Sequence, residues 1–484
     1  MAKTKKYNNI TPPREDRLNS VITWGGDADE LVDITTKKCV KDKNRSFQQT
    51  TFCQEWLAMI TLCTIKDIVI ISHAPVGCVG SMGMISMFNN AGQKLRGEPL
   101  KNGKWMSTNL NDYDVVHGAK DKLEAAVRAA AERYDPKAIF IYSSCVSGII
   151  GEDVDSVVEK LNAELDVPVA PVYCEGFKSK LWASGYDGSF QGALNYLIKD
   201  PVEKRENLIN VINPISFSRL DELEVKRLLD KIGIEVNYVP NFNTVDALSK
   251  SSEAALTASL CTTFSEYFAK ELKNRYGVPY TEKIIPTGLD NTDAWLREIA
   301  GFLGKEKEAE ALIKSERARV QPRIDEIKEK LKGKKVFVSA GQVRSLGIAN
   351  IIADLGMELE GLTTFHYDEV IFDGFEDLTN KCGNFCAHVA NAQPFEQTNI
   401  LANKDLDFYI GHMGETVLAA KQGIPTAMVC NLFRLFLGYD GVVSFGERLL
   451  NVQTNPLFNK TLSKSKPVYT ESWYKEKNAF KYQK

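Results

Sequence analysis

Short apolar runs alternate along the chain with longer segments in which apolar residues recur every three or four positions. The clearest runs are 68–72 and 138–142, which consist almost entirely of aliphatic and aromatic residues. Runs of this length without polar alternation are typical of parallel strands that are buried on both faces. The segments 117–134 and 153–165, which follow in each case, have apolar residues at helical spacing. This alternation predicts a doubly wound α/β fold.

The same pattern recurs in three blocks, which we interpret as domains of residues 1–205, 206–334 and 335–484. A chain of 484 residues is too long for one hydrophobic core, and its length suggests about three domains. Further strands are expected at 169–174, 208–215, 235–239, 335–339, 408–411 and 426–430. Further helices are expected at 54–63, 220–232, within 259–276, within 305–334, up to 355, and at 414–423.

Composition and charge exclude several classes of protein. A net charge of −3 indicates no basic surface for nucleic acid, and no segment approaches the roughly 18 apolar residues of a membrane span. Ten cysteines in so long a chain form no disulfide framework, and the N-terminus has no apolar leader, so a cytoplasmic location is expected. Residues 1–50 are polar and charged, and we expect an extended arm around a partner subunit or a solvated tail.

Three cysteines lie in the first block, and two of them directly follow predicted strands. Cys78 ends SHAPVGC after the first strand, and Cys145 lies in SSCVSG after the second, while Cys53 precedes a predicted helix. In open α/β sheets, ligands bind beyond the carboxyl ends of the strands. Thiolates from separate loops can hold an iron–sulfur cluster there, whereas a buried unpaired cysteine usually only packs.

The sequence motifs around these cysteines resemble those of the catalytic α chain of the nitrogenase component 1 family. They are SHAPVGC, SSCVSGIIGEDV, PVYCEGF, the triplet Leu260-Cys261-Thr262, the tetrapeptide GQVR ending at Arg344, and QGIPTAMVCN, in the same order over more than 350 residues. The resemblance implies an α/β fold of three doubly wound parallel-sheet domains around a metallocluster. The family includes nitrogenases, reductases that do not use dinitrogen, and scaffold proteins for cofactor assembly.

The resemblance implies an electron-relay cluster and an active-site cofactor. Cys53, Cys78 and Cys145 would hold half of a P-cluster-like interface cluster, of 8Fe-7S or 4Fe-4S type, shared with a homologous β subunit in an α₂β₂ heterotetramer. Cys261 would anchor the active-site iron–sulfur cofactor. Nitrogenases place a histidine at the second anchor, where this chain has Cys430; the alternative is that Cys430 is only a small apolar strand residue. Because a thiolate is the softer ligand and favours iron, an all-iron cofactor resembling 8Fe-9S-C is expected.

The surroundings implied for the cofactor differ from those of nitrogenases. Nitrogenases have a glutamine and paired histidines after the Cys-Glu-Gly-Phe motif, and ungapped counting puts Trp182 and Tyr186 there in this chain. Gly414 stands where a lysine helps to bind homocitrate, so no homocitrate is expected. Tyr186 can donate a proton, but its ordinary pKa of about 10 makes it a poorer proton carrier than histidine. Arg344 matches a family arginine beside the cofactor, whose negative charge it would offset.

These differences favour a nitrogenase-like reductase of the methylthio-alkane reductase type. It would cleave a C–S bond of a small thioether reductively, with ATP hydrolysis, and release methanethiol. A transient iron protein with a 4Fe-4S cluster would supply the electrons, because the chain has no GxxxxGKS or GxxxxGKT motif for ATP. The alternatives are the α chain of an iron-only-type nitrogenase and a non-catalytic scaffold for cofactor assembly.

Another possible metal site is the CxxxC motif of Cys382 and Cys386, followed by His388. Cysteine and histidine at such spacing can hold a metal ion. The simpler interpretation is a loop with coincidental cysteines. His73, before Cys78, is interpreted as a structural hydrogen-bonding residue.

Overall fold

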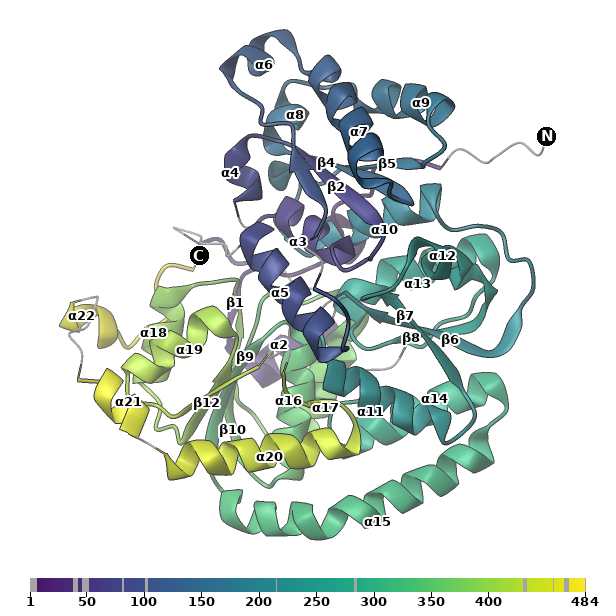
Figure 1. Cartoon of the computed structure of the whole chain (residues 1–484). Helices are drawn as coiled ribbons and strands as arrows, with labels where there is room; N and C mark the ends of the chain where they lie inside the picture. Colours follow the sequence, from purple (N-terminus) through teal and green to yellow (C-terminus); the bar gives the residue numbers. More distant parts are fainter. Residues whose placement is uncertain are drawn as a thin grey trace.

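The structure is a computed structural model that describes residues 7–37, 42–45, 52–80, 82–100, 103–214, 216–282, 285–429, 433–455, 457–464 and 470–483. Its strands form three sheets, and we call each sheet with its helices a domain (Figure 1). Figure 1 shows the first domain at the top, the second at the right and the third at the left. Within the described ranges, no helix has the length and apolar character needed to cross a bilayer.

The first domain contains a parallel four-stranded sheet of order β3-β2-β4-β5. Its strands are β2 (Ile68–His73), β3 (Trp105–Ser107), β4 (Ala138–Ser143) and β5 (Val169–Val172). Its helices are α3 (Gln54–Leu62), α4 (Val76–Val79), α5 (Met82–Leu95), α6 (Asp112–His117), α7 (Lys120–Tyr134), α8 (Cys145–Ile149), α9 (Val154–Glu164), η1 (Gly176–Lys178) and α10 (Ser184–Tyr196).

Helices cover both faces of this sheet, which explains why its strands contain no polar alternation. Ile70 and Phe140 belong to the core that includes α3 and α10. Their neighbours Ile71 and Ile141 belong to a separate core with α7 and α9 on the opposite face. The sheet is therefore doubly wound, as the apolar runs predict.

The second domain contains a parallel sheet in which β6 lies between β7 and β8. Its strands are β6 (Arg205–Asn213), β7 (Glu235–Pro240) and β8 (Ala254–Ser259). Its helices are α11 (Arg219–Asp230), α12 (Val245–Ser249), η2 (Lys250–Glu253), α13 (Thr262–Tyr276), α14 (Leu289–Leu303) and α15 (Glu306–Leu331). Because α13 begins soon after β8 ends, Cys261 lies at the carboxyl end of a strand and is the N-cap of a helix.

The third domain contains a six-stranded sheet of order β1-β11-β10-β9-β12-β13. Its strands are β9 (Lys335–Ala340), β10 (Glu358–Thr364), β11 (Cys386–Val389), β12 (Phe408–Gly411) and β13 (Thr426–Met428), which are parallel, and the antiparallel edge strand β1 (Trp24–Asp27). Its helices are α16 (Gln342–Asp354), η3 (Glu369–Ile371), α17 (Phe372–Cys382), α18 (Pro394–Ala402), α19 (Met413–Lys421), α20 (Gly438–Thr454), α21 (Leu457–Leu462) and α22 (Glu471–Tyr474).

The N-terminal segment differs from both expectations for it. It folds into α1 (Arg14–Arg17), β1 and α2 (Ala28–Thr36), and β1 pairs with β11 of the same chain. Trp24 and Leu31 are buried in the core, and even the side chain of Arg14 is fully buried. A few large apolar residues among many charged ones are enough to anchor this segment. It covers a sheet edge that would otherwise be open to another strand.

Candidate functional site

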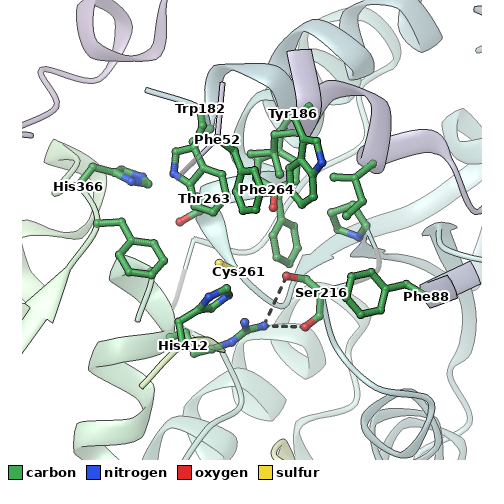
Figure 2. A pocket seen from close by; sticks show the side chains of 18 of the residues that line it. Phe52, Phe88, Trp182, Tyr186, Ser216, Cys261, Thr263, Phe264, His366 and His412 are labelled. Atoms are coloured by element: carbon green, nitrogen blue, oxygen red, sulfur yellow. Dashed lines mark hydrogen bonds between the residues drawn. The ribbon is translucent and has the colours of Figure 1, made fainter. Parts of the chain in front are cut away.

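A cavity of about 180 Å³ lies where the three domains meet. The first domain and the segment before it contribute an aromatic wall, which includes Phe52, Trp56, Trp182 and Tyr186. The second domain contributes Ser216, Cys261, Thr263 and Phe264, and the third contributes Gly341, Arg344, Phe365, His366 and His412. Figure 2 shows Phe52, Trp182 and Tyr186 on one side of the cavity, with Cys261 between them and His412. The structure thus brings together four residues that the sequence singles out, namely Cys261, Arg344, Trp182 and Tyr186.

The aromatic wall is held by ring contacts between elements. Phe52 stacks on Trp56 with ring centroids 3.9 Å apart and also contacts Trp182 at 5.9 Å. Trp182 in turn meets Phe365 of the third domain at 6.0 Å. Ring pairs of this kind add to the free energy gained from burial, because their edges and faces carry opposite partial charge. The wall is therefore a fixed apolar surface that spans two domains.

Among the described residues that line this cavity, Cys261 is the cysteine, and its side chain is buried, with 8% of the residue exposed. Burial raises the pKa of this thiol, and the positive charge of Arg344 acts in the opposite direction. Its position at the N-terminus of a 15-residue helix also favours a thiolate, because the helix dipole is positive there. A metal ion or cluster that binds here must therefore displace a proton.

Arg344 lies in the first turn of α16, where its side chain is held in one orientation. Its Nη2 donates a hydrogen bond of 2.8 Å to the carbonyl oxygen of Ser216, marked by a dashed line in Figure 2. Its guanidinium carbon lies 4.6 Å from the centre of the Phe217 ring. Arginine stays charged at all ordinary pH values, so the cavity contains a permanent cation beside Cys261.

Two histidines line the cavity that sequence reasoning missed. His366 follows β10 by two residues, and His412 follows β12 directly. Imidazoles therefore line the third-domain side of the cavity, whereas Trp182 and Tyr186 line the first-domain side. A polar residue directly after the predicted strand 408–411 was the signal for His412. For His366 the signal was weaker, because β10 itself was not predicted.

A buried ionic network lies behind this side of the cavity and joins the N-terminal segment to the domains. Arg14 Nε donates to Asp368 Oδ2 at 2.9 Å, and Arg14 Nη1 lies 3.4 Å from Asp187 Oδ1. Arg17 Nη2 donates to the other oxygen of Asp187 at 2.9 Å. Burial alone would raise the pKa of Asp368, but Arg14 and His366 outweigh it and hold that pKa well below its usual range. Asp368 is therefore ionised in the interior.

The three cysteines of the first block converge at one edge of the first domain. Cys53 is the N-cap of α3, Cys78 lies in α4, and Cys145 is the first residue of α8. A Cβ atom at Gly176 would lie only 3.2 Å from Cys145 Sγ and 3.0 Å from Cys53 Cβ. Glycine at this position therefore leaves space between two thiols that come from separate elements.

A buried carboxyl group lies beside these thiols. Burial raises the pKa of Glu55 to about 7, although hydrogen bonds with Ser72 and Cys78 partly offset the effect. Burial also raises the pKa of Cys78 to about 12, with further contributions from Glu55 and from the other two cysteines. At neutral pH the Cys78 thiol is protonated in the metal-free protein, so metal loading here also releases protons.

Large apolar side chains are exposed around the same edge. Val76 of α4 is 65% exposed, Ile149 of α8 is 74% exposed, and Phe177 of η1 is 55% exposed. Helix α4 contains Cys78, α8 begins at Cys145, and η1 follows shortly after Cys174. Large exposed apolar side chains on neighbouring elements are typical of surfaces that bind another protein.

The remaining candidates have different outcomes. Cys430 lies outside the described residues. His388 uses both ring nitrogens, with Nε2 2.8 Å from Glu396 and Nδ1 3.1 Å from Thr363, and Cys382 and Cys386 belong to separate hydrophobic clusters. Cys382, Cys386 and His388 therefore form no metal site. Across the described ranges, no group of three or more His, Cys, Asp or Glu side chains is arranged to hold a single metal ion.

Comparison with protein families decides what kind of protein this is. Residues 53–454 match the model of a family described as nitrogenase component 1 type oxidoreductase. The chain belongs to this family. The match begins at Cys53 and includes Cys78, Cys145, Cys261 and Arg344, so both candidate sites lie within the family region.

Similar proteins include cofactor biosynthesis proteins and a nitrogenase alpha chain. The chain is 28% identical over 436 residues to the nitrogenase iron-molybdenum cofactor biosynthesis protein NifE of Methanococcus maripaludis, covering 88% of each chain. It is 30% identical over 412 residues to the NifE of a Nostoc species, covering 83% of each. It is also 27% identical over 406 residues to a nitrogenase molybdenum-iron protein alpha chain of Methanococcus maripaludis, covering 81% of this chain and 84% of that one.

A solved structure has the same fold. The chain matches "Nitrogenase Cp1 at pH 6.5" with a TM-score of 0.70 at 23% identity, over 92% of this chain and all of the other. The predicted fold class, α/β with doubly wound parallel sheets of the nitrogenase component 1 kind, is therefore confirmed.

Proposed function

We propose that this chain is a scaffold subunit on which an iron–sulfur cofactor is assembled and from which it is handed on. The observation that carries the proposal is the likeness to NifE proteins along almost the whole of both chains, together with a cavity whose donors suit such a cofactor. The proposal replaces the reductase as the preferred function, since the named relatives include cofactor biosynthesis proteins and give no support to C–S cleavage.

The donors of the cavity fit an anionic iron–sulfur cofactor. Cys261 offers a soft sulfur ligand, and Arg344 offers a fixed positive charge beside it. His366 adds an imidazole whose two nitrogens have no hydrogen-bond partner. When bound, the cofactor would be a store of electrons held in a low-dielectric site. The chain would hold and orient it, and the aromatic wall would exclude water from it. Cys430 is proposed as a further ligand from the sequence.

The exposed edge of the first domain fits a cluster that is shared with a partner. Cys53, Cys78 and Cys145 are three thiols, and a large cluster needs more ligands than three. Because Cys53 and Cys78 are exposed amid exposed apolar side chains, a homologous β subunit with its own cysteines would complete the site. The expected assembly is an α₂β₂ heterotetramer, with which an iron protein associates transiently.

A reductase is the second candidate, and the aromatic wall favours it. Such a wall would stabilise the methyl and methylene groups of a small thioether by about 0.8 kcal/mol for each buried CH₂. Tyr186 would stand close to the bound substrate as a hydrogen-bond donor, with Arg344 on the other side.

Cofactor transfer separates the two functions. The complex with its β subunit is purified without oxygen and mixed with cofactor-free nitrogenase molybdenum-iron protein, and acetylene reduction by the recipient is measured. A scaffold should activate the recipient, and the Cys261→Ser variant should not. If wild type instead keeps its cofactor and releases methanethiol from 2-(methylthio)ethanol with iron protein and ATP, the chain is a reductase and the scaffold proposal is wrong.

A further inference from the structure

His366 is a buried imidazole without hydrogen bonds at the rim of the cavity. Its side chain is 2% exposed, and neither ring nitrogen has a hydrogen-bond partner. A buried polar atom without a partner lowers stability, and a ligand that supplies the partner removes that cost. Figure 2 shows the ring projecting from the third domain toward the cavity. A ligand in the cavity is the partner that this position offers.

One edge of the imidazole faces a carboxylate. His366 Nε2 lies 3.5 Å from Asp368 Oδ2, a charge contact that is longer than a strong hydrogen bond. The backbone is held as well, because Thr364 Oγ1 donates a 2.7 Å hydrogen bond to the carbonyl oxygen of His366. A carboxylate beside Nε2 favours the tautomer with its proton on that nitrogen, which leaves the lone pair on Nδ1.

Asp368 is itself fixed from several sides. Arg14 Nε donates to its Oδ2 at 2.9 Å, Gln342 Nε2 donates to the same oxygen at 2.5 Å, and Ser20 Oγ donates to Oδ1 at 2.5 Å. Gln342 also accepts from the Asp368 backbone N–H at 2.8 Å. The carboxylate therefore cannot turn away from His366. A histidine backed by a held carboxylate is the arrangement that orients imidazole ligands of metals.

We infer that His366 is a metal ligand of the iron–sulfur cofactor, which it binds through Nδ1 on the side of the cavity formed by the third domain. The inference rests on the proposed function, because it needs a cofactor in the cavity. Asp368 and Arg14 act as positioning residues behind it. His412 lines the same side of the cavity. It is the comparison variant, because an imidazole bound from that position would give the same kind of signal.

Pulsed electron paramagnetic resonance on the cofactor-loaded complex tests this assignment. The probe is the native cofactor, acquired during anaerobic expression with its assembly proteins. Wild type grown with ¹⁵N-histidine should show the hyperfine coupling of one directly bound imidazole nitrogen.

His366→Leu should lose that coupling, and His366→Cys should keep the cofactor bound because it supplies a soft ligand. Asp368→Asn should weaken cofactor retention by roughly 10- to 100-fold. His412→Leu and the surface variant His117→Gln should leave the coupling unchanged.

The outcomes separate this inference from the proposed function. If the wild type contains cofactor but shows no histidine coupling, His366 is not a ligand, and the proposed scaffold function stands. The same conclusion follows if the coupling disappears only in His412→Leu. The labelling experiment on wild type does not depend on whether the Leu variant folds, which far-UV circular dichroism checks separately. A wild-type complex that contains no cavity cofactor would overturn the proposed function and this inference together.

Discussion

The first-domain edge and the interdomain cavity each combine cysteine with a buried carboxyl group, but the fold shifts the pKa values of these two carboxyl groups in opposite directions. At the edge, burial raises the pKa of Glu55 to about 7, and no ion pair to Glu55 is present in the described part of the chain. Behind the cavity, Arg14 and His366 hold the pKa of Asp368 well below its usual range despite complete burial. Near neutral pH Glu55 is therefore partly protonated, whereas Asp368 is fully ionised.

This difference indicates which site the chain completes alone. A buried carboxylate is stable only when a cation and hydrogen bonds compensate for its lost hydration. The cavity receives that compensation from Arg14, in the same chain, whereas the edge has exposed thiols and exposed apolar side chains around Glu55. We therefore expect the cavity to bind its ligand with residues of this chain, and the edge to need residues from a partner.

The largest expected effect comes from removing the cavity thiol. Cys261→Ser should lose essentially all cofactor from the cavity and retain the iron at the first-domain edge, because only the first site loses its sulfur ligand. Iron analysis and electron paramagnetic resonance on the anaerobic complex measure both. Cys63→Ser, at a buried thiol that donates to the Ile60 carbonyl oxygen, is the control and should retain both sets of iron. Full iron in Cys261→Ser would refute the assignment.

The complementary change removes the edge cluster. Cys78→Ala should lose the interface cluster and weaken pairing with the β subunit, while the cofactor in the cavity remains. Size-exclusion chromatography with light scattering measures the pairing, and iron content measures the cluster. If the variant keeps full iron and full activity, Cys78 is a packing residue.

Breaking the network behind the cavity should affect the whole chain. Arg14→Met leaves the carboxylates of Asp187 and Asp368 buried without their cation, which should lower the free energy of unfolding by about 3–5 kcal/mol. Urea unfolding of the metal-free protein measures the loss. Arg128→Met, at an exposed pair on α7, should leave stability nearly unchanged. Equal stability of the two variants would contradict the importance of the network.

The smallest effect is a pH dependence at the edge. The pKa of Glu55 is raised on folding, so between its unfolded value of about 4.3 and its folded value of about 7 the native state binds more protons. Stability should therefore fall as pH rises through this window, by on the order of 2–3 kcal/mol. In Glu55→Gln this decrease should be absent. Asp368 has the opposite sign, since its contribution is present above its unfolded pKa and is lost as pH falls below it.

Urea unfolding of metal-free wild type and Glu55→Gln at several pH values from 5 to 8 measures the Glu55 effect, because the Asp368 effect lies at lower pH. Parallel curves for the two proteins would show that Glu55 does not titrate in this range. Ser72→Ala is a useful second variant, because it removes the 2.9 Å hydrogen bond to Glu55 and should steepen the decrease.

The fold was predictable where a strand is buried on both faces. Segments such as 68–72 and 408–411 are continuous apolar runs, and they became β2 and β12. The strands β8 and β10 were missed because AALTAS and ELEGLTT are rich in small and polar residues, and only their sheet neighbours make them strands. His366 was missed for the same reason. It follows the end of β10, and that end could not be recognised because β10 itself was not predicted.

The candidate site was predictable only as separate parts. Cys261, Arg344, Trp182 and Tyr186 came from motifs, and the structure places all of them around one cavity. The buried ionic network could not be predicted, because charged residues in a polar N-terminal stretch are usually solvated. Nothing local to Arg14 indicates the carboxylates that it meets in the fold.

The ion pair between Arg14 and Asp368 also sets an order of events in time. The two residues are 354 positions apart, and a ribosome that adds about 5–20 residues per second needs roughly 20–70 s to pass from one to the other. During that interval the first two domains can form, and Arg14 can already meet Asp187 of the first domain. Its contact with Asp368 must await the third domain, so the ion pair that starts from one of the first residues synthesised is completed late. A nascent chain therefore has Cys261 in place before it has the third-domain side of the cavity, which includes Arg344 and His366.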